Sequence, residues 1–242
     1  MITTSDGLRL DSVRHDGGRE TVVLVHGITA DLDENGLFTE LAPRLTAAGF
    51  SVLRFSFRGH GRSDGRPRDM TVAGELLDLR AVVESVGGPV SVVASSFGAV
   101  STALSLASLP LRRVVLWQPV LDLRRTFLEP ELPRGIALYS DRASLAEKGF
   151  LDIEGRFQLG ESLFEEFTHL DPREAFLASG MPALVVHGSG DEHVSHDIAR
   201  ETAIERPETD WHSLADAGHG FGDSAEKALE VTVRWLSREE GG

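Results

Sequence analysis

Short runs of apolar and β-branched residues alternate along the chain with longer stretches in which apolar residues recur every three or four positions. The first pattern is typical of buried strands and the second of amphipathic helices. Strands are predicted at residues 21–26, 51–56, 90–94, 113–117 and 183–187, and helices at 37–48, 71–86, 97–109 and 225–236. Residues 8–15 resemble part of an earlier edge hairpin. This alternation predicts an α/β fold, with a mostly parallel sheet and helices on both faces.

The alternation stops between residues 122 and 177, where prolines, glycines and charged residues interrupt any strand. A helix is predicted at 159–167. We expect a single domain over residues 1–242, with a core of 1–121 and 178–242 and a cap insertion at about 122–177. The large apolar residues of the cap are Phe127, Leu128, Phe150, Phe157, Leu163, Phe164 and Phe167. Most of them are expected to pack the cap onto the core, and one or two to face a crevice beneath the cap.

Composition narrows the possible functions. The 38 acidic residues exceed the 24 basic ones and give a net charge of −14, which disfavours nucleic acid and anionic membranes as partners. The chain has no cysteine, so disulfides, thiolate metal sites and a cysteine nucleophile are excluded. No secretory signal pattern and no apolar stretch of about 18 residues is visible. We therefore expect a cytoplasmic protein without membrane insertion.

The strongest chemical signal lies where the strand at 90–94 runs directly into a helix. Ser96 stands at the centre of a pattern like G-x-S-x-G, with Ala94 in place of the first glycine and Gly98 as the second. A serine at the tip of a sharp, strained turn needs small neighbours, and the helix start favours a developing negative charge. The alternative interpretation is that Ser95 or Ser96 only caps the helix.

Two later loops supply an acid and a histidine. Asp191 follows the strand at 183–187, and His219 lies in a glycine-flanked loop before the last helix. Serine, acid and histidine in this order form one of the known catalytic triad orders, which gives Ser96 as nucleophile, Asp191 as orienting acid and His219 as base. Asp122 is an alternative acid. Asp216 lies too close to His219 in sequence to orient it and is expected to shape the loop.

Further motifs carry a family resemblance. Residues 23–28, VLVHGI, resemble the first strand and oxyanion turn of the α/β-hydrolase family, and residues 57–65, FRGHGRSDG, resemble its R-G-x-G-x-S loop. The chain thus resembles a bacterial α/β-hydrolase-fold serine hydrolase. With residues 69–72 and the acidic helix that follows, it is most similar to the cinnamoyl/feruloyl esterase and monoacylglycerol-lipase-like branch. The resemblance implies an α/β-hydrolase fold with a small cap and no cofactor.

The same resemblance and the triad logic imply a mechanism. Ser96 attacks an acyl carbonyl, and the backbone N–H groups of Ile28 and Phe97 form the oxyanion hole. We expect a hydrolase of carboxylic esters with small to medium hydrophobic or aromatic acyl groups, whose partner is a small-molecule ester. An acyl thioesterase, a C–C bond hydrolase or perhydrolase, and a non-catalytic ligand-binding protein of this fold remain alternatives.

Other polar residues are interpreted as structural. Three histidines at strand ends are expected to make structural hydrogen bonds: His26, His60 and His187. Two groups could suggest metal but lack ligand spacing: His193 with His196, and Asp31 with Asp33 and Glu34. We expect no metal. The glycines at 59, 61 and 65 lack the G-K-[ST] of a phosphate loop, so no nucleotide cofactor is expected.

Overall fold

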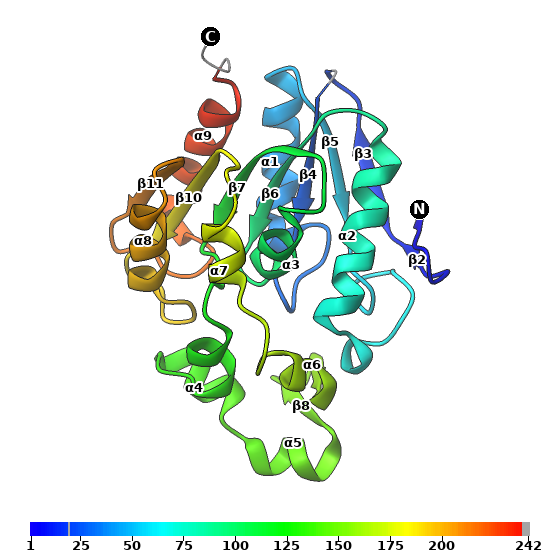
Figure 1. The fold of residues 1–242 in the computed structure, drawn as a ribbon, viewed down its shortest axis with the longest axis vertical. Coiled ribbons are helices and arrows are strands. Elements are labelled where there is room, and N and C mark those ends of the chain that lie inside the picture. Colours follow the sequence, from blue (N-terminus) through cyan, green and yellow to red (C-terminus); the bar gives the residue numbers. More distant parts are fainter. Residues whose placement is uncertain (19, 239–242) are drawn as a thin grey trace.

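The computed structural model of the protein describes residues 1–18 and 20–238. Within them, seven strands form the central sheet in the order β11-β10-β7-β6-β4-β5-β3, and β3 alone runs antiparallel to its neighbour (Figure 1). These strands are β3 (Ser12–His15), β4 (Thr21–Val25), β5 (Ser51–Phe55), β6 (Val90–Ser95), β7 (Leu111–Trp117), β10 (Ala183–Gly188) and β11 (Thr209–Leu214). The predicted α/β fold class is confirmed.

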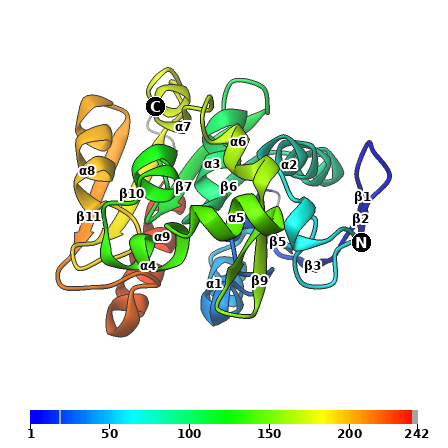
Figure 2. The same cartoon turned by 90° about the horizontal axis from the view of Figure 1, so that it is seen from below.

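Helices cover both faces of the sheet, as Figures 1 and 2 show. One face packs against α2 (Val72–Val86), α3 (Gly98–Ser105) and α8 (His196–Glu205), and the other against α1 (Leu37–Ala47) and α9 (Ala225–Leu236). Every residue of the central strands β4, β5, β6 and β10 is buried, because helices shield both sides. The continuous apolar runs in the sequence follow from this double burial.

Most of the segment between β7 and β10 lies at the carboxyl ends of the parallel strands, whereas its last helix, α7, lies over a face of the sheet (Figure 1). Its elements are α4 (Pro133–Tyr139), α5 (Arg142–Lys148), β8 (Phe150–Ile153), β9 (Phe157–Gly160), α6 (Glu161–Glu166), α7 (Pro172–Leu177) and a π-helical turn at Arg124–Leu128. We call residues 122–177 the cap. Most of its buried apolar residues pack with Phe97 and Val100 of the core. Phe176 of α7 instead joins the apolar cluster between the sheet and helices α2, α3 and α8.

The predicted helix at 159–167 is wrong at its start. Leu159 and Gly160 belong to β9, which pairs antiparallel with β8 through Leu151↔Leu159 and Phe150↔Gly160, and the helix begins at Glu161. Pairing with β8 in a short hairpin thus overrides the helical pattern at these two residues. The expected edge hairpin is divided: β2 (Arg9–Leu10) pairs with β1 (Ile2–Thr3), while β3 joins the main sheet. Among the described residues, no helix is both long and apolar enough to cross a membrane.

Helix α2 buries a carboxyl group within the helix layer. Glu75 is 1% exposed, and its Oε2 has no hydrogen-bond partner among the described residues. Burial raises the pKa of Glu75 well above its ordinary value, and the charges of Asp78 and Glu166 act in the same direction. The folded chain therefore holds a proton on Glu75 at pH values where the unfolded chain has released it. Because of this difference, stability falls as pH rises above the ordinary glutamate pKa.

We expect Glu75→Gln to raise the melting temperature at pH 8 and to raise it less at pH 5, because the amide has no proton to lose. Each 1 kcal/mol gained corresponds to about 2–4 °C in a domain of this size. Thermal unfolding of both proteins at the two pH values measures the effect. Glu84→Gln on the exposed side of the same helix serves as the control. An equal shift at both pH values would contradict the assignment of a buried, protonated carboxyl.

Candidate active site

Ser96 occupies a sharp turn between β6 and α3. Its backbone is left-handed, with φ of 50°, and its N–H donates to the Trp117 carbonyl at 2.8 Å. A Cβ on Gly98 would lie 2.5 Å from the His26 carbonyl oxygen, so only glycine fits there. Ala94, which replaces the first glycine of the motif, is not among the residues with positive φ. The turn therefore tolerates alanine at 94 but requires glycine at 98.

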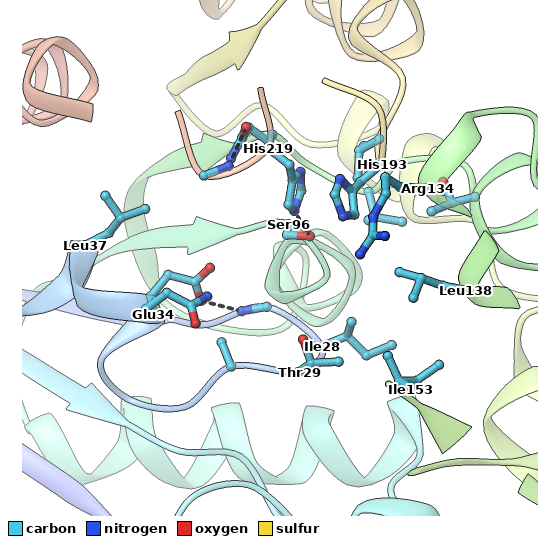
Figure 3. A pocket seen from close by; sticks show the side chains of 18 of the residues that line it. Ile28, Thr29, Glu34, Leu37, Ser96, Arg134, Leu138, Ile153, His193 and His219 are labelled. Carbon is cyan, nitrogen blue, oxygen red and sulfur yellow. Dashed lines mark hydrogen bonds between the residues drawn. The ribbon is translucent and has the colours of Figure 1, made fainter. Parts of the chain in front are cut away.

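Three side chains far apart in sequence meet beside this turn, and Figure 3 shows two of them, Ser96 and His219. Ser96 Oγ lies 3.1 Å from His219 Nε2, and His219 Nδ1 lies 2.8 Å from Asp191 Oδ2. A carboxylate only accepts hydrogen bonds, so Nδ1 carries the ring proton and Nε2 is left to accept from the Ser96 hydroxyl. The structure thus brings together the three residues that the sequence analysis selected, in an arrangement that can move a proton from hydroxyl to imidazole.

Asp191 is buried but well supplied with hydrogen-bond donors. Its Oδ1 accepts from the backbone N–H groups of His193 at 2.8 Å and Val194 at 3.0 Å. Burial by itself would raise the pKa of Asp191. The hydrogen bonds from His187 and His219 outweigh burial and hold the pKa far below its ordinary value. The carboxyl group is therefore charged throughout the neutral and mildly acidic range.

Two residues that support this arrangement were not predicted as functional. His187 is fully buried, with Nε2 3.3 Å from Asp191 Oδ2 and 3.2 Å from the Val194 carbonyl. Both neighbours are acceptors, so Nε2 carries the proton and donates towards them. Gln118 has a left-handed backbone with φ of 46°, and its Oε1 accepts from the Gly220 N–H at 3.1 Å, which anchors the His219 loop. Their positions at strand ends were the only sequence signal.

The amides of Ile28 and Phe97 are available to a ligand. Among the described residues, neither N–H donates a hydrogen bond. The Ile28 peptide is held on both sides, because the Gly27 carbonyl contacts His26 Nδ1 at 2.8 Å and the Ile28 carbonyl contacts His60 Nε2 at 2.8 Å. Two of the histidines expected to be structural therefore hold the turn that carries one of these amides.

Ser96 opens into a pocket of about 470 Å³ beneath the cap (Figure 3). Its large apolar lining residues are Ile28, Leu37, Val120, Phe127, Leu138, Ile153 and Val194. Of the cap residues proposed from sequence, Phe127 lines the pocket, while Leu163, Phe164 and Phe167 pack inside the cap. The lining also includes polar residues that were not predicted to line a pocket, among them Thr29, Glu34, Asn35, Arg134, Tyr139 and Glu154.

Arg134 ties the cap to the loop beside Asp191. Its backbone N–H donates to the Glu192 carbonyl at 3.1 Å, and its guanidinium pairs with Glu154 at 2.8 Å. His193, next along this loop, stacks on His219 with ring centroids 4.7 Å apart. Burial and the nearby charge of His219 lower the pKa of His193 to about 4, so this ring is neutral near pH 7.

The other residues considered as site residues in the sequence make contacts of their own. Asp122 accepts a hydrogen bond from the Arg125 N–H at 2.9 Å and so stabilises a turn at the start of the cap. Asp216 has a left-handed backbone in the loop before His219.

Possible ligand atoms of Asp191, His193 and His219 lie within 4.8 Å of one another. Both oxygens of Asp191 already accept hydrogen bonds, and the two rings are stacked, so their in-plane lone pairs do not converge on one point. Asp33 pairs with Arg54, Glu34 with Gly27 and His196 with Ser213.

A family profile and a relative of known name both match this chain. A sequence profile described as "Alpha/beta hydrolase family" matches residues 22–232. The chain is 28% identical over 241 residues to the dihydrolipoyllysine-residue acetyltransferase component of an acetoin cleaving system from Cupriavidus necator, covering 88% of this chain and 62% of that protein. The chain thus spans less than two thirds of that relative's length.

Two solved structures share the fold at low sequence identity. Est1E from Butyrivibrio proteoclasticus, solved with bound ferulic acid, has a TM-score of 0.85 at 20% identity, covering 98% of this chain and 97% of that one. A monoacylglycerol lipase from Paleococcus ferrophilus has a TM-score of 0.71 at 20% identity, covering 95% of this chain and 98% of that one. The profile match confirms the family resemblance noted in the sequence, and these two structures share its fold.

We expect a fluorophosphonate to label the wild-type chain at Ser96, because the hydroxyl has a base in hydrogen-bond reach. Ser96→Ala should abolish labelling, and Ser101→Ala, which removes a buried serine of α3, should retain it. Intact mass and peptide mapping locate the adduct. Labelling of Ser96→Ala at the wild-type rate would show that Ser96 is not the reactive residue.

Proposed function

Because the chain belongs to the alpha/beta hydrolase family, we propose that it is a serine hydrolase that cleaves carboxylic esters. The observation that carries the proposal is the hydrogen-bonded series from Ser96 Oγ to His219 at 3.1 Å and from His219 to Asp191 at 2.8 Å. A neutral hydroxyl is a weak nucleophile unless a base removes its proton during attack. The 3.1 Å contact of His219 Nε2 with Ser96 Oγ supports His219 as that base.

The reaction follows from these contacts. Ser96 Oγ attacks the ester carbonyl carbon while His219 Nε2 takes the hydroxyl proton, and the charged Asp191 stabilises the imidazolium that forms. His219 then gives the proton to the departing alkoxide oxygen, which leaves as an alcohol. Water attacks the acyl-enzyme by the same route in the second half of the cycle. The acid is released and the Ser96 hydroxyl is restored.

The negative charge that develops on the carbonyl oxygen needs hydrogen-bond donors. The amides of Ile28 and Phe97 have no partner among the described residues, one lining the pocket with Ser96 and the other next to Ser96 in sequence. Helix α3 begins at Gly98, so its partial positive charge lies at the same place. Donors fixed in advance stabilise the transition state without reorganisation, and they supply a large share of catalysis.

The pocket indicates the size and polarity of the acyl group. At about 470 Å³ it fits a small to medium group, and its lining includes seven large apolar side chains. We propose hydrophobic or aromatic acyl groups, selected by the cap of a single domain whose core is 1–121 and 178–242. Ferulic acid bound to the structurally similar Est1E supports aromatic acids as probes.

We expect the wild-type chain to hydrolyse p-nitrophenyl butyrate and methyl hydroxycinnamates, and Ser96→Ala to reduce kcat by about 10⁴-fold or more. The two proteins are compared on a panel of acyl esters and matching acyl thioesters. Circular dichroism confirms that the variant is folded. Higher kcat/KM for the thioesters would assign the chain to the thioesterases, and no turnover of any substrate would favour a ligand-binding protein.

We expect kcat/KM to fall about tenfold per pH unit on the acid side, because His219 must be neutral to act as a base. Asp191 does not contribute to this limb, since its lowered pKa keeps it charged. His193, whose pKa is lowered to about 4, does not contribute either, so His193→Asn should keep the same slope. A rate that stays constant down to about pH 4 would contradict His219 as the base.

A further inference from the structure

A buried carboxylate outside the Ser96–His219–Asp191 series lies beside the pocket. Glu34 is 7% exposed, and each of its oxygens accepts one hydrogen bond. Oε2 accepts from the Gly27 N–H at 2.7 Å, and Oε1 accepts from the Ser95 hydroxyl at 2.9 Å. Gly27 follows β4 and Ser95 ends β6, so the side chain of Glu34, labelled in Figure 3, links the ends of two neighbouring strands.

These two strand ends lead into the two free amides. Ile28 follows Gly27, and Phe97 comes two residues after Ser95. Glycine has wide freedom in φ and ψ, so the orientation of the Gly27 segment depends on its contacts. His26 and His60 hold the carbonyls on either side of the Ile28 N–H, and Glu34 holds the Gly27 N–H. A Cβ at Gly27 would lie 3.3 Å from Ser96 Cβ and 3.5 Å from Glu34 Oε1. The Gly27 backbone is therefore held between the nucleophile and the Glu34 carboxylate.

The backbone around Glu34 adopts a conformation that most residues avoid. Glu34 and Asn35 have φ of 46° and 53°, in the left-handed region. Such strain costs free energy and persists where the surroundings determine the conformation, often at functional sites. The turn is held by a hydrogen bond from Glu34 N–H to the Asp31 carbonyl at 3.0 Å and by the ion pair of Asp33 with Arg54.

Burial also disfavours the charged form of the Glu34 carboxyl group. It raises the pKa of Glu34, while the hydrogen bonds from Gly27 and Ser95 oppose that rise. The left-handed backbone and the desolvation of the Glu34 carboxyl both cost folding free energy. Such costs are common where the contacts of a residue serve a function. Both contacts go to the segments that carry the amides beside Ser96.

We propose that Glu34 is a positioning residue that sets the spacing between the Ile28 and Phe97 amides by binding Gly27 and Ser95. The inference rests on the proposed ester hydrolysis. Hydrogen bonding rather than charge carries the effect, because a negative charge beside a developing oxyanion would oppose the reaction. An amide at position 34 can accept from the Gly27 N–H and donate to Ser95 Oγ, so Glu34→Gln preserves both links.

The first test is kinetic. Glu34→Ala should lower kcat for p-nitrophenyl butyrate by about 10- to 100-fold with KM changed less than about threefold, because oxyanion contacts form fully only in the transition state. Glu34→Gln should keep kcat within about threefold of wild type. Glu75→Gln, a buried carboxyl of α2 outside the pocket, is the matched control and should keep wild-type kcat.

The second test does not depend on activity. Hydrogen–deuterium exchange of the peptide covering residues 24–33 should be faster in Glu34→Ala than in wild type, because the Gly27 N–H loses its acceptor. Exchange in Glu34→Gln should match wild type. If the wild-type chain hydrolyses no ester, the proposed function fails, while this measurement still shows whether Glu34 fixes the turn.

Two results would overturn the proposal. One is a Glu34→Ala protein with kcat within twofold of wild type, and the other is a Glu34→Gln protein as slow as Glu34→Ala, which would mean that charge is required. Thermal unfolding shows whether each variant is folded. If Glu34→Ala does not fold, Ser95→Ala decides, because it removes one of the two links: kcat should fall about threefold or more, and an unchanged kcat refutes the positioning role.

Discussion

The left-handed backbone of Ser96 is the constraint on which the rest of the site depends. The turn is held by the neighbouring strand, because Ser96 N–H donates to the Trp117 carbonyl and the Ser96 carbonyl accepts from Val120 N–H at 3.1 Å. Gln118, between them, is also left-handed and binds the His219 loop through Gly220. The end of β7 therefore positions both the hydroxyl and the imidazole. Parallel strands deliver these parts to one edge of the sheet, where the hydrogen bonds of β7 fix their separation.

Buried acids at this edge are stabilised by nearby donors rather than by lysine or arginine. Asp191 receives two backbone N–H groups and contacts two imidazoles, and Glu34 receives one backbone N–H and one hydroxyl. Donors of this kind are short-range and fixed by the backbone, so they satisfy a carboxylate without filling the pocket with long side chains. The space beside Ser96 remains free for an acyl group.

Much of the fold and the core of the site could be predicted from sequence because the signals are local. Buried strands give continuous apolar runs, and Ser96, Asp191 and His219 each stand in a recognisable loop. The rest depends on partners far away in the chain. Strand β11 was missed because it lies at the sheet edge and is only partly buried. His187 and Glu34 have no local pattern that reveals their contacts, and the polar cap residues Arg134 and Glu154 reach the pocket only when the cap folds over the sheet.

The link between the Arg134 amide and the Glu192 carbonyl has a consequence for protein engineering. Exchange of a cap segment is one way to alter substrate range. It assumes that the geometry of the catalytic residues does not depend on the cap. Here the cap shares a main-chain hydrogen bond with the residue that follows Asp191. A chimera whose new cap lacks an amide at that point would disturb the loop that orients the carboxylate, so the seam of a successful graft must lie inside α4, on the far side of Arg134.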